Sequence, residues 1–393
     1  MTKLIYVSHW RYPSAKVNPR VAMRTCEEFA RKGYDTELWI PRRRNPQFRG
    51  MDPFAYHRIE RNFAMKRLPV LDLYGILPGD APFFLMVGTF AVSVFSYALL
   101  RGIARSAIFY SLDLRDMVLL HLADAHVFYE IHDYYKTPVH WLNRFCFLRA
   151  RGIITTNRLK LEAIEKEFAR PAATMLHKPN AVDTSVFRTD ISRSDARKAL
   201  NLPQDQTIIL YCGQVLLWKG VGTLLASHEY MRPGEFIYFN VGGDEKGALK
   251  EFKQKYSETG ARNIVIAEGQ THSVIPLWLR AADVLVLPNT AKDNASKYET
   301  SPVKLFEYMA SGRPIVSSDL PSIRNVVDES MVWFFEPDNP QSLAGQVHAA
   351  INEKDAAAKK SRRAQDEAEK YTWDRRFTDI ISFMRAMLRA ARA

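Results

Sequence analysis

The sequence is poor in cysteine and shows no cysteine pattern. Its 393 residues include three cysteines, Cys26, Cys146 and Cys212, which are far apart in the chain. This scatter argues against a disulfide framework and a zinc site, and it fits a reducing compartment. The first residues read as a buried strand and lack the layout of a signal peptide. We therefore expect a cytoplasmic protein.

Two further features are missing. The chain contains no Asp-x-Asp pair, which weakens the case for a diphosphate bridged by a metal ion, so we expect no metal cofactor. No helix-turn-helix, zinc-finger or RNA-binding signature accompanies the net charge of +12. Such a charge favours an acidic partner, which could be nucleic acid, anionic lipid or a phosphorylated substrate. Without a signature we do not expect nucleic acid.

Charge is absent from residues 81–100, a run of 20 mostly apolar residues. By length the run could span a membrane. However, the strand-like segments on both sides of it should belong to one sheet, and a span would put part of that sheet across the bilayer. Three alternatives stay open: a helix buried in the N-terminal domain, a helix lying in a membrane interface, and a true span.

What the chain does contain is an alternation of short apolar runs and amphipathic segments. Leu4 to Ser8 reads as a strand, a polar loop and a helical pattern follow, and Leu38-Trp-Ile reads as the next strand. This order is typical of a doubly wound α/β domain, and the length suits two of them. No repeat of 20–50 residues is visible.

The most informative stretch runs from Glu299 to Val316. Ser301 is expected to cap a helix that starts at Pro302 and ends at Gly312, because Ser, Pro and Gly favour these positions. The free N–H groups and the dipole of a helix N-terminus suit a phosphate. Glu307 would lie roughly 7–8 Å along the axis, at about 1.5 Å per residue, within reach of a ribose. A capped helix with two surface glutamates is the alternative.

The same stretch resembles retaining GT-B glycosyltransferases, in particular glycosyltransferase family 4 of the polysaccharide-biosynthesis type. Glu299 and Glu307 form the Glu-x7-Glu pattern of these enzymes, and the segment from Ser301 to Val316 is similar to theirs in sequence. The resemblance implies two Rossmann-like domains that face a central cleft. Residues 1–182 would form the acceptor-side domain and residues 183–372 the donor domain, while residues 373–393 would form a helix that crosses back.

Other segments extend the resemblance to nearly the whole chain. The segment 177–187 is similar to the family's interdomain segment, with Ala181 in place of the usual glycine. Cys212 to Gly222 is similar to the loop that holds the donor diphosphate with an arginine and a lysine. Lys219 keeps the lysine, but Gln214 stands near the place of the arginine. The donor-binding residues implied by the resemblance are Gly213, Gln214, Lys219, Gln270, Glu299, Ser301, Pro302, Val303, Lys304 and Glu307.

In the N-terminal half, two segments would lie on the acceptor side. His132 and Asp133 follow an apolar run and resemble the family's strand-end Glu-x-His-Asp segment, which would place His132 against the transferred sugar. The loop from His9 to Arg20 resembles the family's first loop without its glycines. Its acceptor-side candidates, together with Asp133, are Trp10, Lys16 and Asn18.

The resemblance thus implies a retaining transfer of a hexose-type sugar from a UDP- or GDP-linked donor to a glycan or a lipid-diphosphate acceptor. His132, Glu299 and Lys219 are the expected catalytic residues, and cell-surface polysaccharide synthesis is the expected context. The basic surface and residues 81–100 are compatible with peripheral contact with the inner face of the cell membrane. The alternatives are a non-catalytic nucleotide-sugar or glycan-binding protein and a sugar-nucleotide epimerase.

Overall fold

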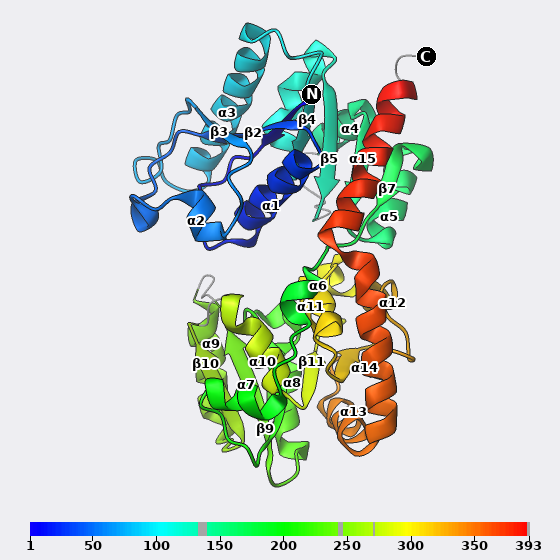
Figure 1. The fold of residues 1–393 in the computed structure, drawn as a ribbon. Coiled ribbons are helices and arrows are strands. Elements are labelled where there is room, and N and C mark those ends of the chain that lie inside the picture. The colour runs from blue at the N-terminus through cyan, green and yellow to red at the C-terminus, as the bar shows by residue number, and fades with distance from the viewer. Residues whose placement is uncertain (133–139, 243–246, 270–271, 391–393) are drawn as a thin grey trace. The chain divides into compact units, whose positions relative to one another are not determined.

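The structure, a computed structural model, describes residues 1–132, 140–242, 247–269 and 272–390. The chain divides into two compact units (Figure 1). Unit 1 comprises Met1–Lys178 and Arg376–Ala393, and unit 2 comprises Pro179–Arg375. From the sequence we placed the two boundaries after residues 182 and 372.

Unit 1 is built on a parallel sheet of seven strands in the order β3-β2-β1-β4-β5-β6-β7. The strands are β1 Lys3–Val7, β2 Asp35–Pro41, β3 Ala64–Leu68, β4 Ile108–Ser111, β5 His126–Ile131, β6 Gly152–Thr155 and β7 Met175–His177. The helices are α1 Val17–Arg31, η1 Pro46–Phe48, α2 Pro53–His57, α3 Ala81–Leu100, η2 Leu114–Ala123, α4 His140–Arg149, α5 Arg158–Phe168, η3 Ala172–Thr174 and most of α15 Trp373–Ala390.

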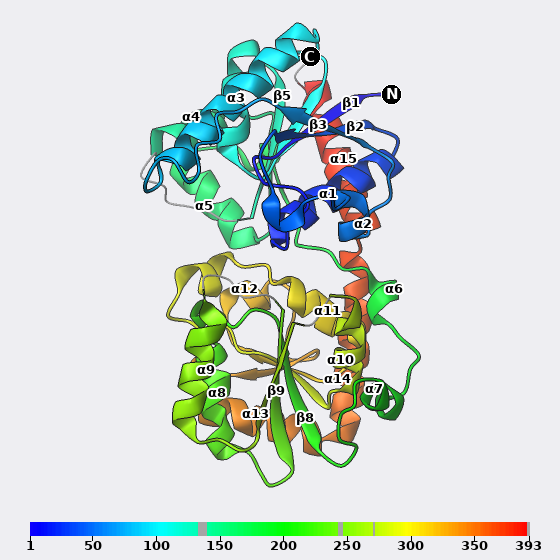
Figure 2. The same cartoon turned by 90° about the vertical axis from the view of Figure 1, so that its left-hand side faces the viewer.

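Helices cover both faces of this sheet because alternate strand residues point to opposite sides. Ile5 and Val7 belong to the core beneath α3, η2, α4 and α5. On the other face, Tyr110 packs against Phe29 of α1 with 5.3 Å between ring centroids. Phe29 in turn contacts Phe377 of α15 at 5.0 Å, so the C-terminal helix closes this face (Figure 2).

Unit 2 is built on a second parallel sheet, in the order β10-β9-β8-β11-β12-β13. The strands are β8 Thr207–Cys212, β9 Glu235–Val241, β10 Ile264–Glu268, β11 Val284–Leu287, β12 Ile315–Ser318 and β13 Trp333–Phe335. The helices are α6 Thr184–Phe187, α7 Arg193–Ala199, η4 Leu217–Lys219, α8 Val221–Ala226, η5 Ser227–Tyr230, α9 Ala248–Thr259, η6 His272–Val274, α10 Ile275–Ala281, the π-helical turn η7 Ala295–Glu299, α11 Val303–Ser311, α12 Pro321–Arg324, α13 Pro340–Asn352, α14 Lys354–Ala368 and η8 Glu369–Tyr371.

The strand order reverses at one point in each sheet. In unit 1 the reversal lies between β1 and β4, and in unit 2 it lies between β8 and β11. Doubly wound sheets bind ligands outside the carboxyl ends of the strands at such a point. In unit 2 the backbones of two loops meet there, because a Cβ on Gly220, which has φ +71°, would lie 1.8 Å from the carbonyl oxygen of Pro288. Both halves are doubly wound, as the sequence predicted.

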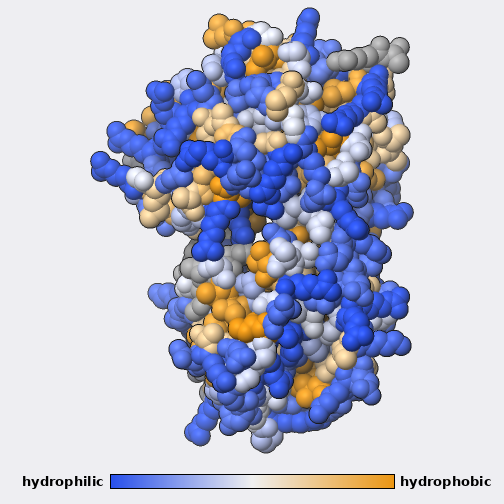
Figure 3. All heavy atoms as spheres, in the orientation of Figure 1, coloured by the Kyte–Doolittle hydropathy of each residue, from blue (hydrophilic) through white to orange (hydrophobic). Residues whose placement is uncertain are grey.

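The uncharged run 81–100 forms one helix, α3, that is long and apolar enough to cross a membrane. One face of α3 packs into the core of unit 1 through Phe90, Val94 and Ala98. The opposite face is open to solvent, with Val92 53% and Leu99 50% exposed, and Phe84 and Leu100 at the two ends of the helix are 60% and 85% exposed. Figure 3 shows hydrophobic surface over the upper end of this helix, beside hydrophilic side chains. The run is therefore neither fully buried nor fully open in the folded unit.

Candidate functional site

In unit 2 the loop after β8 carries two predicted site residues that bond to each other. The ammonium Nζ of Lys219 donates to Oε1 of Gln214 at 3.0 Å. The hydroxyl of Tyr211 donates to the backbone carbonyl of Gln214 at 2.8 Å. Lys219 also lies above the ring of Trp218, 5.1 Å from its centroid. These contacts hold the loop in one shape where the strand order reverses.

The helix expected after residue 301 is α11, and it starts one residue later than expected. Val303 is its first residue, and Pro302 is its N-cap residue, without a side-chain cap. The prediction that Ser301 caps the helix is wrong, because Ser301 bonds to Asn180 instead. Ser301 Oγ accepts from the N–H of Asn180 at 3.2 Å, and its carbonyl accepts from Asn180 Nδ2 at 2.6 Å. The helix ends at Gly312 with φ +66°, as predicted.

The two glutamates of the Glu-x7-Glu pattern lie on either side of the start of α11. Glu299 is the last residue of the η7 turn and is half-buried. Glu307 lies in the middle of α11 and is 8% exposed. The next residue, Tyr308, fixes α11 to the end of β8, because its hydroxyl accepts from the N–H of Cys212 at 2.9 Å. The helix N-terminus therefore belongs to the same end of the sheet as the Lys219 loop.

Lys304 contributes more than the backbone amide anticipated from the sequence. Its Nζ donates to the hydroxyl of Tyr211 at 2.6 Å and lies 4.1 Å from the centroid of that ring. The side chain of Lys304 also passes over Gly213, because a Cβ added to Gly213 would lie 2.7 Å from Nζ of Lys304. Burial and then the charge of Lys219 hold the pKa of Lys304 well below its ordinary value. Two lysine side chains thus meet over one loop.

In unit 1, His132 follows the end of β5 and is held by a buried charge network. His132 Nε2 bonds to the carboxylate of Glu130, which also accepts from Tyr110 and, at 2.7 Å, from Arg376 of α15. Glu130 is 1% and Arg376 4% exposed. Burial alone would raise the pKa of Glu130, but Arg376 and His132 keep it far below its ordinary value. The backbone carbonyl of His132 accepts from the buried ammonium of Lys160.

A second histidine, His9, lies at the point where the order of the first sheet reverses. The sequence did not single it out. Its Nδ1 bonds to Oδ1 of Asp116 at 2.8 Å, and its backbone N–H donates to Oδ2 of Asp116 at 3.1 Å. Burial alone would lower the pKa of His9, but the neighbouring Asp116 raises it. Asp116 takes Nδ1, so Nε2 is the other ring nitrogen of His9, whose side chain is buried.

His9, Asp113 and Asp116 also have the spacing of a metal site, since their ligand atoms lie within 4.8 Å of one another. Their donor atoms are engaged by the protein. Arg115 holds both oxygens of Asp113, from Nε at 2.8 Å and from Nη2 at 2.5 Å. Asp116 is bonded to His9, and the hydroxyl of Ser111 reaches it at 3.4 Å. We therefore interpret the cluster as a network of hydrogen bonds within the protein.

The acceptor-side candidates lie close to His9. The ring of Trp10 stacks on the ring of His9 with 5.3 Å between centroids, and Lys16 Nζ lies 5.0 Å from the centroid of Trp10. Asn18, expected in the loop, is the second residue of α1. The helix starts early because its third residue, Pro19, needs no N–H partner in a first turn. Asp133 and Gln270 lie outside the described residues.

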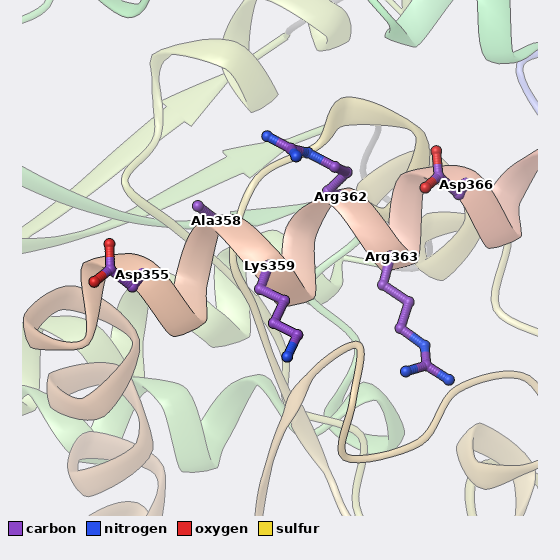
Figure 4. A pocket seen from close by; sticks show the side chains of 6 residues that line it. All are labelled: Asp355, Ala358, Lys359, Arg362, Arg363 and Asp366. Carbon is purple, nitrogen blue, oxygen red and sulfur yellow. The ribbon is translucent and has the colours of Figure 1, made fainter.

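A shallow hollow on α14 lies apart from these groups (Figure 4). It is lined by side chains of that single helix: Asp355, Ala358, Lys359, Arg362, Arg363 and Asp366. Figure 4 shows Arg362 and Arg363 pointing to different sides of the helix, so no group of side chains converges there. We assign it no ligand.

Comparison with known proteins shows similarity to glycosyltransferases. Residues 206–353 match the family described as glycosyl transferases group 1. D-inositol 3-phosphate glycosyltransferase of Jonesia denitrificans is 24% identical over 214 residues, or 51% of this chain and 49% of the relative. Alpha-D-kanosaminyltransferase of Streptomyces kanamyceticus is 25% identical over 203 residues, or 50% of each chain. The chain thus spans about half the length of these curated relatives.

Solved structures extend the likeness to the whole chain. Sucrose-phosphate synthase from Thermosynechococcus elongatus has a TM-score of 0.75 at 16% identity and covers 99% of this chain and 100% of its own. Anabaena HepE in complex with UDP has a TM-score of 0.73 at 15% identity, with 100% and 99% covered. These neighbours are GT-B glycosyltransferases, and the expected fold of two parallel-sheet α/β domains is confirmed.

Proposed function

We propose that this chain is a glycosyltransferase of the retaining family 4 type that moves a hexose-type sugar from a nucleotide-diphosphate sugar to an acceptor hydroxyl. One observation carries the proposal. The Lys219 loop and the N-terminus of α11 share the carboxyl end of the strands of the second sheet, with Glu299 and Glu307 on either side of the helix start. The matched family and the UDP complex of Anabaena HepE support a donor of this class.

The donor residues take roles that follow from their chemistry. A leaving diphosphate needs fixed positive charge and oriented N–H groups. Lys219 and the amides of Val303 and Lys304 supply them. Glu307 would accept hydrogen bonds from the ribose, and Glu299 from the sugar hydroxyls. His132, oriented by Glu130, would contact the transferred sugar.

For the acceptor, unit 1 contains the imidazole of His9, which is hydrogen-bonded to the carboxylate of Asp116. The bond from His9 to Asp116 fixes the imidazole and favours its protonation, so Nε2 can bind an acceptor hydroxyl. Trp10 and Lys16 continue this surface with an aromatic ring and an ammonium, groups that suit a sugar face and a phosphate. A glycan or a lipid-diphosphate acceptor has both features.

We further propose that unit 1 rests on the inner face of the membrane through the open face of α3, where a lipid-linked acceptor would be found. Val92 and Leu99 on this face are exposed, as are Phe84 and Leu100 at the ends of the helix. Arg105 lines a hollow beside the C-terminal end. Val92→Glu should weaken flotation with vesicles of 70% phosphatidylcholine and 30% phosphatidylglycerol, whereas Val186→Glu in unit 2 should not. Equal flotation of the two variants would contradict the membrane face.

Transfer itself is tested with a panel of UDP- and GDP-hexoses and a lipid-diphosphate or glycan acceptor. One donor should be consumed, without added Mg²⁺ and in the presence of EDTA, and NMR of the product should show a retained anomeric configuration. Glu299→Ala and Lys219→Ala together should abolish turnover, while the exposed Lys359→Met on α14 should not change it. Turnover that survives the double variant would overturn the site. A requirement for Mg²⁺ would overturn the metal-independent mechanism.

A further inference from the structure

The donor loop lacks a positive charge where the resembling family has an arginine, because Gln214 stands near that place. A diphosphate carries more than one negative charge, and a neutral amide is a weaker donor to it than a guanidinium. Gln214 is also occupied, since its Oε1 accepts from Lys219. If the loop binds a diphosphate, a second cation is expected from elsewhere.

The side chain of Lys304 supplies that cation from another element. It leaves the first turn of α11 and brings its Nζ over the end of β8, where it bonds to Tyr211. Tyr211 donates in turn to Gln214, which accepts from Lys219, so one hydrogen-bonded chain links the two ammonium groups. They reach the loop from α11 and from η4.

The backbone of the loop is shaped to accommodate this lysine. Gly213 has φ +140°, a conformation that residues with a Cβ rarely adopt. A Cβ there would lie 2.7 Å from Nζ and 3.2 Å from Cδ and Cε of Lys304. Glycine thus leaves room for the long side chain to cross the loop and place its charge beside Lys219.

The protein around Lys304 offsets its charge only in part, through the nearby carboxylate of Glu307. Within the described residues Lys304 takes part in no ion pair, and its neighbours on the loop are the neutral groups of Tyr211 and Gly213. Burial and then the charge of Lys219 disfavour the protonated form of Lys304 and hold its pKa low. An anion bound between them would favour both ammonium groups, and the adjacent amides of α11 would add to this attraction.

We infer that Lys304 Nζ, together with Lys219, binds the diphosphate of the donor and takes the place of the missing arginine. This inference rests on the proposed function. It extends that function by assigning the second diphosphate charge to a side chain from the first turn of α11. A corollary is that the site requires a second cation beside Lys219, and that either a lysine or an arginine side chain can supply it.

The test compares each nucleoside diphosphate with its nucleoside on the full-length chain. UDP, GDP and ADP are titrated against uridine, guanosine and adenosine by isothermal calorimetry. Lys304→Met should weaken the nucleoside diphosphate that binds by tenfold or more and leave the matching nucleoside within about twofold, since the nucleoside lacks the diphosphate. Lys359→Met, an exposed lysine on α14, is the matched control and should change neither.

A second test moves the positive charge from residue 304 to residue 214. Gln214→Arg combined with Lys304→Met should recover most of the lost diphosphate affinity, because it returns a cation to the loop. Circular dichroism melts confirm that each variant is folded. A wild-type chain that binds a nucleoside diphosphate with the same affinity as Lys304→Met would overturn the inference and leave the proposed function standing. A folded wild-type chain that binds none of the three would overturn both.

Discussion

Replacing Arg376 by Met removes one partner of the buried ion pair that joins α15 to β5. Arg376 and Glu130 are 4% and 1% exposed, and Nη2 of Arg376 lies 2.7 Å from Oε1 of Glu130. Losing one member of such a pair costs roughly 3–5 kcal/mol, because the remaining charge stays buried without compensation. Glu130 keeps Tyr110 and His132 as partners, so we expect the lower end of this range.

The sequence provides a matched control in Arg375→Met. Arg375 precedes Arg376 in α15 and is exposed, so its substitution should change stability by less than about 0.5 kcal/mol. Glu130→Gln combined with Arg376→Met should recover part of the loss, since no buried charge then lacks a partner. The double variant therefore separates two contributions of Arg376 to stability: its charge, and the packing of its side chain.

Hydrogen exchange by mass spectrometry measures this effect within one unit. A loss of about 3 kcal/mol should speed exchange of the peptides covering β5 and α15 by roughly a hundredfold, at tenfold per 1.4 kcal/mol. Peptides of β8 and β9 in unit 2 serve as the internal reference. Equal exchange rates of β5 and α15 in the Arg376→Met and Arg375→Met variants would refute the claim that this pair fastens the C-terminal helix.

Two further predictions concern single residues. Gly213→Ala should destabilise unit 2 by roughly 1–3 kcal/mol in urea unfolding, because alanine is strained at the positive φ of this residue. It should also weaken nucleotide binding in calorimetry, because the added Cβ would displace the Lys304 side chain. Unchanged binding would contradict the passage of Lys304 over Gly213. Burial and then the charges of Arg149 and Arg170 lower the pKa of His121 to about 4. As the pH falls, His121 is therefore protonated in the unfolded chain before it is protonated in the folded chain. The stability associated with neutral His121 is therefore present above pH 6.5 and lost between pH 6.5 and 4, on the order of 3 kcal/mol in all. His121→Gln should flatten that slope in urea titrations, and an unchanged slope would contradict it.

The doubly wound fold could be predicted because its signals are local. Alternating apolar runs and amphipathic segments mark the strands and helices, and Gly312 ends α11 where a positive φ is needed. Likewise, the positions of His132 at the end of a strand and of Lys219 in the loop region after a strand follow from the order of elements. Each of these inferences uses neighbours within one turn or one strand.

The parts that could not be predicted depend on partners far away in the sequence. Ser301 looks like a helix cap, but it bonds to Asn180, which is 121 residues away. His9 and Asp116 are 107 residues apart along the chain, and they meet only because β1 and β4 are adjacent in the sheet. The strand order would have indicated this pair, since both residues follow strands at the point of reversal. The path of the Lys304 side chain over Gly213 depends on three-dimensional packing, which periodicity does not encode.

The central claim is that α11 and the loop after β8 bind a nucleotide diphosphate, and thermal shift with UDP, GDP, ADP and CMP tests it most directly. A ligand at about 100 times its dissociation constant adds roughly 2.7 kcal/mol, enough to raise Tm by several degrees. We predict that one nucleotide stabilises the wild type and stabilises Glu307→Ala much less, each relative to its own unliganded Tm. No shift with any nucleotide, or an equal shift in both proteins, would contradict the claim.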